Sequence, residues 1–146
     1  MSAPRLARIP FVPQLESSDC GAACLASVLG GYGYETTLAS VIEAAGGTRD
    51  GLNARQLLEA ANRLGLRGRG VRLDPSDFAA LPRGAVLHWG FNHFVVFDGT
   101  VRGGVRIIDP ATGPRRVVWQ DVHQQFTGVA LLFEPGESFT RQWLQP

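Results

Sequence analysis

Apolar residues recur at helical spacing in the first half of the chain. Each of these apolar stretches follows a Ser, Thr, Asp or Asn that can cap a helix, and each ends at one or two glycines. For the first helix, the caps are Ser17, Ser18 and Asp19. The pattern predicts three helices, over about residues 20–29, 38–45 and 54–64.

The second half alternates apolar and polar residues or forms short β-branched runs, which are typical of strands. Strands are predicted over about residues 66–73, 84–89, 93–99, 105–110, 114–119 and 129–134. A helical turn after Asp74-Pro75 and a short helix over about 120–126 interrupt them. Helices first and strands afterwards predict an α+β fold with a mostly antiparallel sheet.

Composition and charge narrow the class of protein. The 146 residues are 45% apolar and 18% charged, which indicates one globular domain. The net charge of +1 gives no electrostatic case for binding nucleic acid. No apolar run approaches the roughly 18–20 residues that span a bilayer, and the N-terminus does not resemble a secretory signal.

The two cysteines, Cys20 and Cys24, are expected to be free thiols with different roles. Cys20 should lie at the start of the first helix, where the helix dipole stabilises an anion and so favours the nucleophilic thiolate. On position alone, a small buried thiol is an equally good interpretation of Cys20. Cys24, one turn later in an apolar stretch, is expected to pack in the core.

His93 is the candidate general base. It begins an apolar strand directly after Asn92, at the mouth of the predicted sheet, whereas His88 lies inside a strand and is expected to be structural. Asp109 ends the next strand. A hairpin turning near residues 100–104 places residue 93 opposite about residue 110, so Asp109 can orient the imidazole. The alternative for Asp109 is a local turn contact.

Two further possibilities concern an oxyanion donor and a metal. Gln14, six residues before Cys20, could join the Cys20 backbone N–H as an oxyanion hole, although a lone loop glutamine is usually solvated. The pairs Cys20/Cys24 and His88/His93 superficially suggest a zinc site. Zinc is disfavoured because Cys24 belongs to an apolar helix and three predicted elements separate the pairs. The chain has no P-loop motif.

Several motifs occur in the order found in one family. The chain resembles the bacteriocin-processing, or double-glycine leader, cysteine peptidases that form the N-terminal domain of peptidase-containing ABC transporters. The matching segments are QLESSDCGAACLASVLGGYG, GLNARQLLEAANRLGLRGRGVRL, HWGFNHFVVF, IIDPATGPRRV and FTGVALLFEPGESF. They extend over roughly residues 9–139.

The resemblance implies a papain-like fold and a thiol endopeptidase that cuts a leader peptide after Gly-Gly. It implies Cys20 as nucleophile, His93 as base and acid, Asp109 as orienting group and Gln14 as oxyanion donor. It also implies no cofactor for this domain, with ATP used only in a separate transporter domain.

Three segments are expected. The three prolines within residues 1–13 predict an extended segment, and the peptidase domain is expected over 14–135. Residues 136–146 have no buried pattern and are expected to be a linker towards a transmembrane part. The expected partners are a precursor's leader peptide and fused membrane and nucleotide-binding domains. The expected location is the cytoplasmic face of the bacterial inner membrane, with this chain itself soluble. The alternative is a non-cleaving, cargo-binding domain of an exporter, which the presence of Cys20 disfavours.

Overall fold

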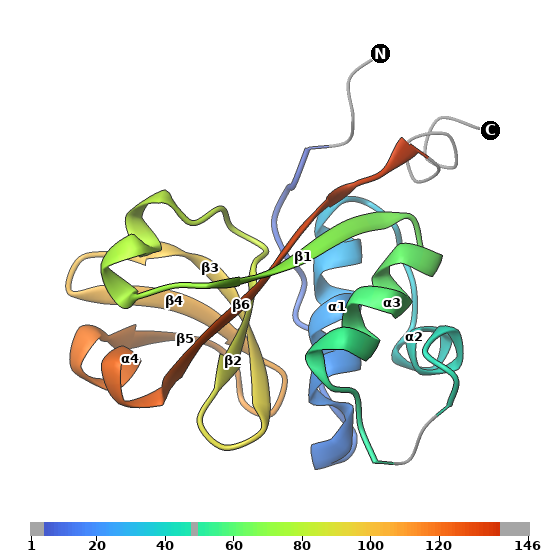
Figure 1. Ribbon diagram of the computed structural model, residues 1–146, viewed down its shortest axis with the longest axis horizontal. Coiled ribbons are helices and arrows are strands. Elements are labelled where there is room, and N and C mark those ends of the chain that lie inside the picture. Colours follow the sequence, from blue (N-terminus) through green and yellow to red (C-terminus); the bar gives the residue numbers. More distant parts are fainter. Residues whose placement is uncertain (1–4, 48–49, 138–146) are drawn as a thin grey trace.

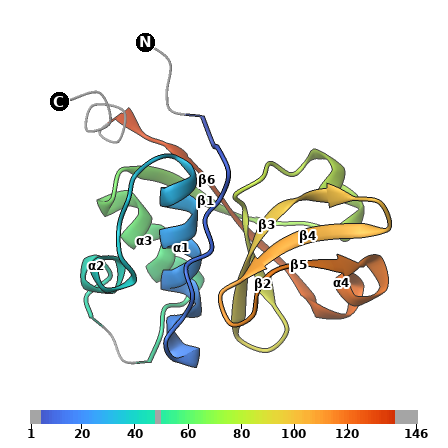
Figure 2. The same cartoon turned by 180° about the vertical axis from the view of Figure 1, so that it is seen from behind.

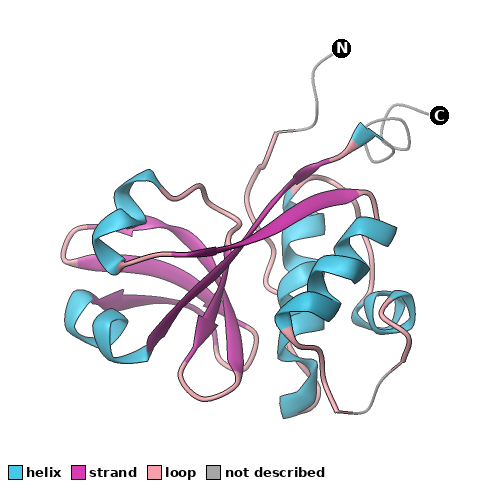
Figure 3. Cartoon of the chain, in the orientation of Figure 1, coloured by secondary structure: helices cyan, strands magenta, loops and turns pink. Residues whose placement is uncertain are grey.

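The computed structural model describes residues 5–47 and 50–137. Helices gather on one side and a twisted sheet lies on the other (Figures 1 and 3). The helical layer holds α1 (Cys20–Gly31), α2 (Leu38–Ala44) and α3 (Ala54–Arg63), and the 3-10 turn η1 (Ser17–Asp19) leads directly into α1. The predicted helices are therefore present, and the side chains of Thr37 and Asn53 accept hydrogen bonds at the starts of α2 and α3.

The sheet has six strands, and every pair is antiparallel. Its order is β1-β6-β2-β3-β4-β5, so the last strand lies between the first and the second. The strands are β1 (Leu66–Arg72), β2 (Val86–Trp89), β3 (His93–Val101), β4 (Gly104–Asp109), β5 (Gly113–Val118) and β6 (Phe126–Pro135). The 3-10 helix η2 (Pro75–Ala80) and α4 (Trp119–Gln125) lie away from the helical layer (Figure 3). The predicted α+β class with an antiparallel sheet is confirmed.

Both faces of the central strands are buried. On β3, Phe94 and Val96 pack in one cluster with α1 and α3, while Val95 and Phe97 pack in a second cluster with η2 and α4. Alternate residues of a strand point to opposite faces, so two buried faces explain the continuous apolar run of β3. The first cluster fixes α1 against the sheet, and this packing brings the N-terminus of α1 to the start of β3.

The segment before α1 runs between the helical layer and the sheet (Figure 2). Its backbone bonds first to α1, from Ala7 N–H to Gly31 O at 2.8 Å, and finally to the sheet side, from Gln14 N–H to Pro110 O at 2.9 Å. A Cβ on Gly30 would lie 2.5 Å from Pro10, so glycine permits this close approach. Of the segment expected to be a linker, 136–146, only residues 136 and 137 are among the described residues.

Candidate active site

Cys20 is the first residue of α1. The side chain of Asp19 does not cap this helix; it accepts a hydrogen bond from Glu16 N–H at 3.0 Å instead. The positive end of the α1 dipole is therefore directed at the Cys20 region without a carboxylate cap on it. Cys20 is buried but lines a surface pocket, so a substrate can reach it.

His93 contacts both Cys20 and Asp109. Its Nε2–H donates to Asp109 Oδ1 at 2.8 Å, and the neighbouring Cys20 thiol also helps to raise the pKa of His93. Since Nε2 faces Asp109, Nδ1 is the nitrogen left for the thiol. The β3–β4 register, in which Val96 faces Ile108, brings the start of β3 to the turn after β4, close to the predicted position.

The charges of the site favour a protonated imidazole. The hydrogen bond to Asp109, followed by the one to Cys20, raises the pKa of His93 to about 9 against the opposing effect of burial. Burial alone would raise the pKa of Asp109. Hydrogen bonds from His93, Ala111 N–H and Arg115 outweigh that effect and hold the Asp109 pKa below its ordinary value. The arrangement suits a thiolate–imidazolium pair next to an ionised carboxylate.

Arg115 is a contact of this site that sequence analysis missed. Its Nη2 donates to Asp109 Oδ2 at 3.3 Å, while Ala111 N–H donates to Asp109 Oδ1 at 2.9 Å. The available signal was spacing: Asp109 pairs with Gly113 across the β4–β5 hairpin, and Arg115 follows Gly113 by two residues on the same face of β5. In sequence, Arg115 is only one of two adjacent arginines in a strand.

Gln14 is held by its backbone to the loop that follows Asp109, through the bond to Pro110 O. Its side-chain Oε1 is buried and has no hydrogen-bond partner among the described residues. A buried polar atom without a partner is costly, and this atom is the acceptor of the amide, whereas an oxyanion would bind to its NH₂ donor. No described side chain competes for that oxygen.

The pocket beside Cys20 has a volume of about 320 Å³ and mostly polar walls. Asn92, which lies in it, has φ +66°, the one positive φ of a non-glycine residue in the described part of the chain. This left-handed conformation turns the chain sharply into β3. Gly51 also lines this pocket, and a Cβ on it would lie 2.9 Å from Ser18 O.

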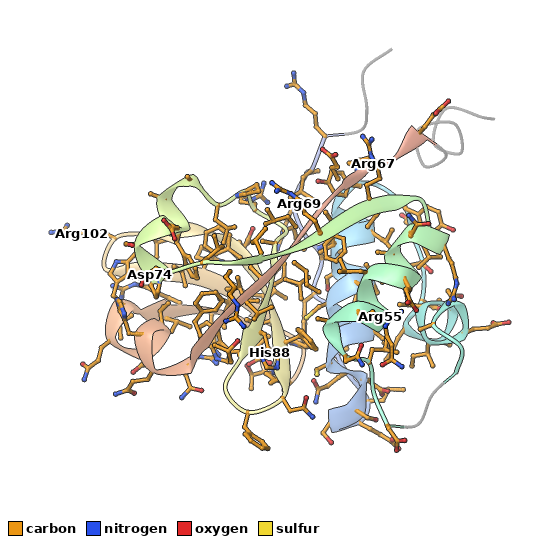
Figure 4. The ribbon with its side chains drawn as sticks, in the orientation of Figure 1. Arg55, Arg67, Arg69, Asp74, His88 and Arg102 are labelled. Atoms are coloured by element: carbon orange, nitrogen blue, oxygen red, sulfur yellow. The ribbon has the colours of Figure 1, made fainter. Side chains whose placement is uncertain are left out.

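Cys24 and His88 lie outside this constellation. Burial, then the nearby Cys20 and Asp109, raise the pKa of the Cys24 thiol well above its ordinary value. His88, labelled in Figure 4, belongs to β2 and its Nδ1 lies 2.9 Å from Thr127 Oγ1 on β6. Within residues 5–47 and 50–137, no three His, Cys, Asp or Glu side chains cluster as metal ligands would. None of the helices in these same ranges has the length and apolar character of a membrane span.

Comparisons with known proteins show the family and the fold of the chain. Residues 8–138 match the sequence model of the Peptidase C39 family. The chain is 34% identical over 143 residues to the colicin V secretion/processing ATP-binding protein CvaB of Escherichia coli. The aligned region covers 94% of this chain and 20% of that protein. The chain thus spans about a fifth of the length of the curated transporters it matches.

Two solved structures have the same fold. One is a double glycine motif protease from an AMS/PCAT transporter in complex with the leader peptide, with TM-score 0.81, 38% identity, and coverage of 88% of this chain and 93% of that chain. The other is the peptidase domain of Streptococcus ComA, a bifunctional ABC transporter, with TM-score 0.80, 27% identity, and coverage of 88% and 99%.

Proposed function

The chain belongs to the Peptidase C39 family and is a cysteine peptidase, and from this premise we propose that it removes the leader of a secreted precursor peptide by cutting after a Gly-Gly motif. The observation that carries the proposal is the continuous set of contacts from Cys20 through His93 to Asp109. A nucleophile, a base bonded to it and a group that orients the base are what thiol catalysis needs.

The proposed reaction has two steps. The Cys20 thiolate attacks the carbonyl carbon of the second glycine, and the backbone N–H of Cys20 and the side-chain NH₂ of Gln14 stabilise the oxyanion. The imidazolium of His93 gives its proton to the leaving amine as the C–N bond breaks. Water, deprotonated by His93, then attacks the thioester and releases the leader and the thiol. Asp109 keeps Nδ1 directed at Cys20 in both steps by accepting the hydrogen bond from Nε2–H.

The substrate class rests on relatives. A structure that is 38% identical to this chain is described as a double glycine motif protease and holds a leader peptide.

The relatives also support a place in export. The Escherichia coli relative is a secretion/processing ATP-binding protein, so we propose that this domain works with transporter membrane and nucleotide-binding domains. In that arrangement, ATP is used by the nucleotide-binding domains and the peptidase requires no cofactor. We further propose that the leader is cut before or during export, with the domain on the cytoplasmic face of the membrane. Residues 14–135 are the proposed peptidase domain and 136–146 the proposed linker.

The experiment is mass spectrometry of synthetic leader peptides that carry Gly-Gly, incubated with the chain. Cys20→Ala is the nucleophile variant, and Cys24→Ala is the matched control because it removes a thiol one helical turn away. We expect cleavage after the second glycine with wild type and Cys24→Ala, and none with Cys20→Ala. Saturable leader binding without cleavage by wild type would instead identify a cargo-binding domain, and cleavage by Cys20→Ala would refute the nucleophile.

A further inference from the structure

We propose that Arg115 is a positioning residue of this active site, which fixes the Asp109 carboxylate so that His93 stays directed at Cys20. The proposal rests on the proposed thiol chemistry of these three residues and adds a fourth member to it. Arg115 is not expected to touch the substrate; it acts through Asp109.

The hydrogen bonds of Asp109 are divided unequally between its two oxygens. Oδ1 accepts from His93 Nε2 at 2.8 Å and from Ala111 N–H at 2.9 Å. Oδ2 accepts from Arg115 Nη2 at 3.3 Å, and this is the bond that the described residues give it. Since Asp109 is only 4% exposed, little solvent can replace that partner. Loss of Arg115 would therefore leave a buried carboxylate oxygen poorly satisfied.

The orientation of the carboxylate depends on these bonds. The last torsion of an aspartate side chain is broad, so its staggered preferences alone do not hold the carboxylate plane. Ala111 N–H and His93 both donate hydrogen bonds to Oδ1. Arg115 binds the opposite oxygen and so opposes rotation that would carry Oδ1 away from His93.

The hairpin between β4 and β5 makes this contact possible. Gly113 lies directly opposite Asp109 and has no side chain that could compete for the carboxylate. Arg115, two residues further along the same face, can then reach back diagonally to Asp109. A larger residue at position 113 would meet Phe11, whose ring lies 3.7 Å from the place of a Cβ, and it would adopt the glycine's φ of +100° only with strain.

Arg115 can be changed without opening the core. Its side chain is 44% exposed, in contrast to the buried Asp109. The neighbouring Arg116 is the matched control: it is also an arginine of β5, but its Nη2 donates to Arg102 O at 2.7 Å. Arg102, labelled in Figure 4, lies at the end of the sheet that is far from α1, α2 and α3.

The experiment compares Arg115→Gln, Arg115→Lys and Arg116→Gln, each alone and in the Asp109→Asn background. Two rates are measured: kcat and KM on a double-glycine leader peptide, and the rate of Cys20 alkylation by iodoacetamide followed by mass spectrometry. The second rate needs no substrate, so a failure of the proposed cleavage would leave this test intact.

We expect Arg115→Gln to lower kcat and the alkylation rate at pH 7 about fivefold to twentyfold with KM changed less than twofold. Arg115→Lys should recover most of the loss, because the contact is made through a single nitrogen. Arg116→Gln should match wild type. In the Asp109→Asn background, Arg115→Gln should have no further effect.

Three results would overturn the proposal. One is an Arg115→Gln enzyme whose kcat and alkylation rate stay within twofold of wild type. Another is an equal loss in the Asp109→Asn background, which would show that Arg115 acts independently of Asp109. The third is an equal loss in Arg116→Gln, which would assign the effect to the stability of β5 rather than to the carboxylate.

Discussion

Replacing Asp109 with asparagine keeps the shape of the side chain and removes its charge. Asp109 accepts hydrogen bonds from His93, Ala111 and Arg115, all of which are donors. An asparagine has one oxygen and one NH₂ group. Whichever way the amide turns, one donor in the site faces another donor. The His93–Asp109 bond also changes from a charge-assisted bond to a neutral one.

The magnitude follows from that change. A hydrogen bond to a charged group contributes about 1.5–3 kcal/mol, against about 0.5–1.5 kcal/mol for a neutral one. The difference of about 1–1.5 kcal/mol corresponds to lowering the pKa of His93 from about 9 to about 8. Together with the misdirected ring, we expect kcat at pH 7 to fall about tenfold to hundredfold, which is about 1.4–2.7 kcal/mol of activation free energy.

The assay is kcat on a double-glycine leader peptide between pH 5 and 10, together with thermal unfolding. Asp98→Asn is the control. Asp98 lies on the same strand as His93, but its ion pair is with Arg83, at 3.0 Å, and not with the active site. The alkaline limb of kcat/KM, measured together with kcat, reports loss of the His93 proton in the free enzyme. It should lie near pH 9 in wild type and about one pH unit lower in Asp109→Asn. A variant with wild-type kcat and an unmoved limb would refute the reasoning and leave Asp109 as a turn residue.

Gln14→Ala is expected to lower kcat about 10²–10³-fold if its amide stabilises the oxyanion; an effect under twofold would remove it from the site. Iodoacetamide should label Cys20 in the native chain and leave Cys24 unlabelled, since burial raises the pKa of the Cys24 thiol; equal labelling seen by mass spectrometry would contradict this. The pKa of His93 is higher in the folded chain than in the unfolded chain. Protonated His93 therefore contributes fully to the free energy of unfolding below about pH 6.5, and this contribution is lost as pH rises through about 9. Solvent screening of this half-buried ring limits the loss to about 1–2 kcal/mol, measurable by urea unfolding at pH 6 and 9.5, and stability that is the same at both would contradict it.

Local patterns were enough to predict the helices and strands, because helix caps and strand alternation depend on residues that are close together in the sequence. Asn53, for example, caps α3 with a hydrogen bond from Gln56 N–H at 2.8 Å. The juxtaposition of His93 and Asp109 could also be predicted, because a single hairpin sets it. The order of the strands in the sheet could not be predicted. β6 pairs with both β1 and β2, and this pairing depends on contacts between residues that are far apart in the sequence.

Arg115 escaped prediction for a different physical reason. Two adjacent arginines on a strand point to opposite faces, and sequence alone does not say which one faces the buried carboxylate. The choice depends on the register between β4 and β5, which sets Gly113 opposite Asp109. A shift of that register by one residue would exchange Arg115 with Arg116 at the site.

The site is shared between two layers, and this makes its geometry a consequence of the core between them. Cys20 comes from the helical layer, while His93, Asp109 and Arg115 come from the sheet. The cluster that joins the layers contains Cys24 and Leu25 of α1 beside Phe94 of β3. Cys24 follows Cys20 by one helical turn, and Phe94 follows His93 directly. Packing between α1 and β3 therefore sets the distance from the thiol to the imidazole.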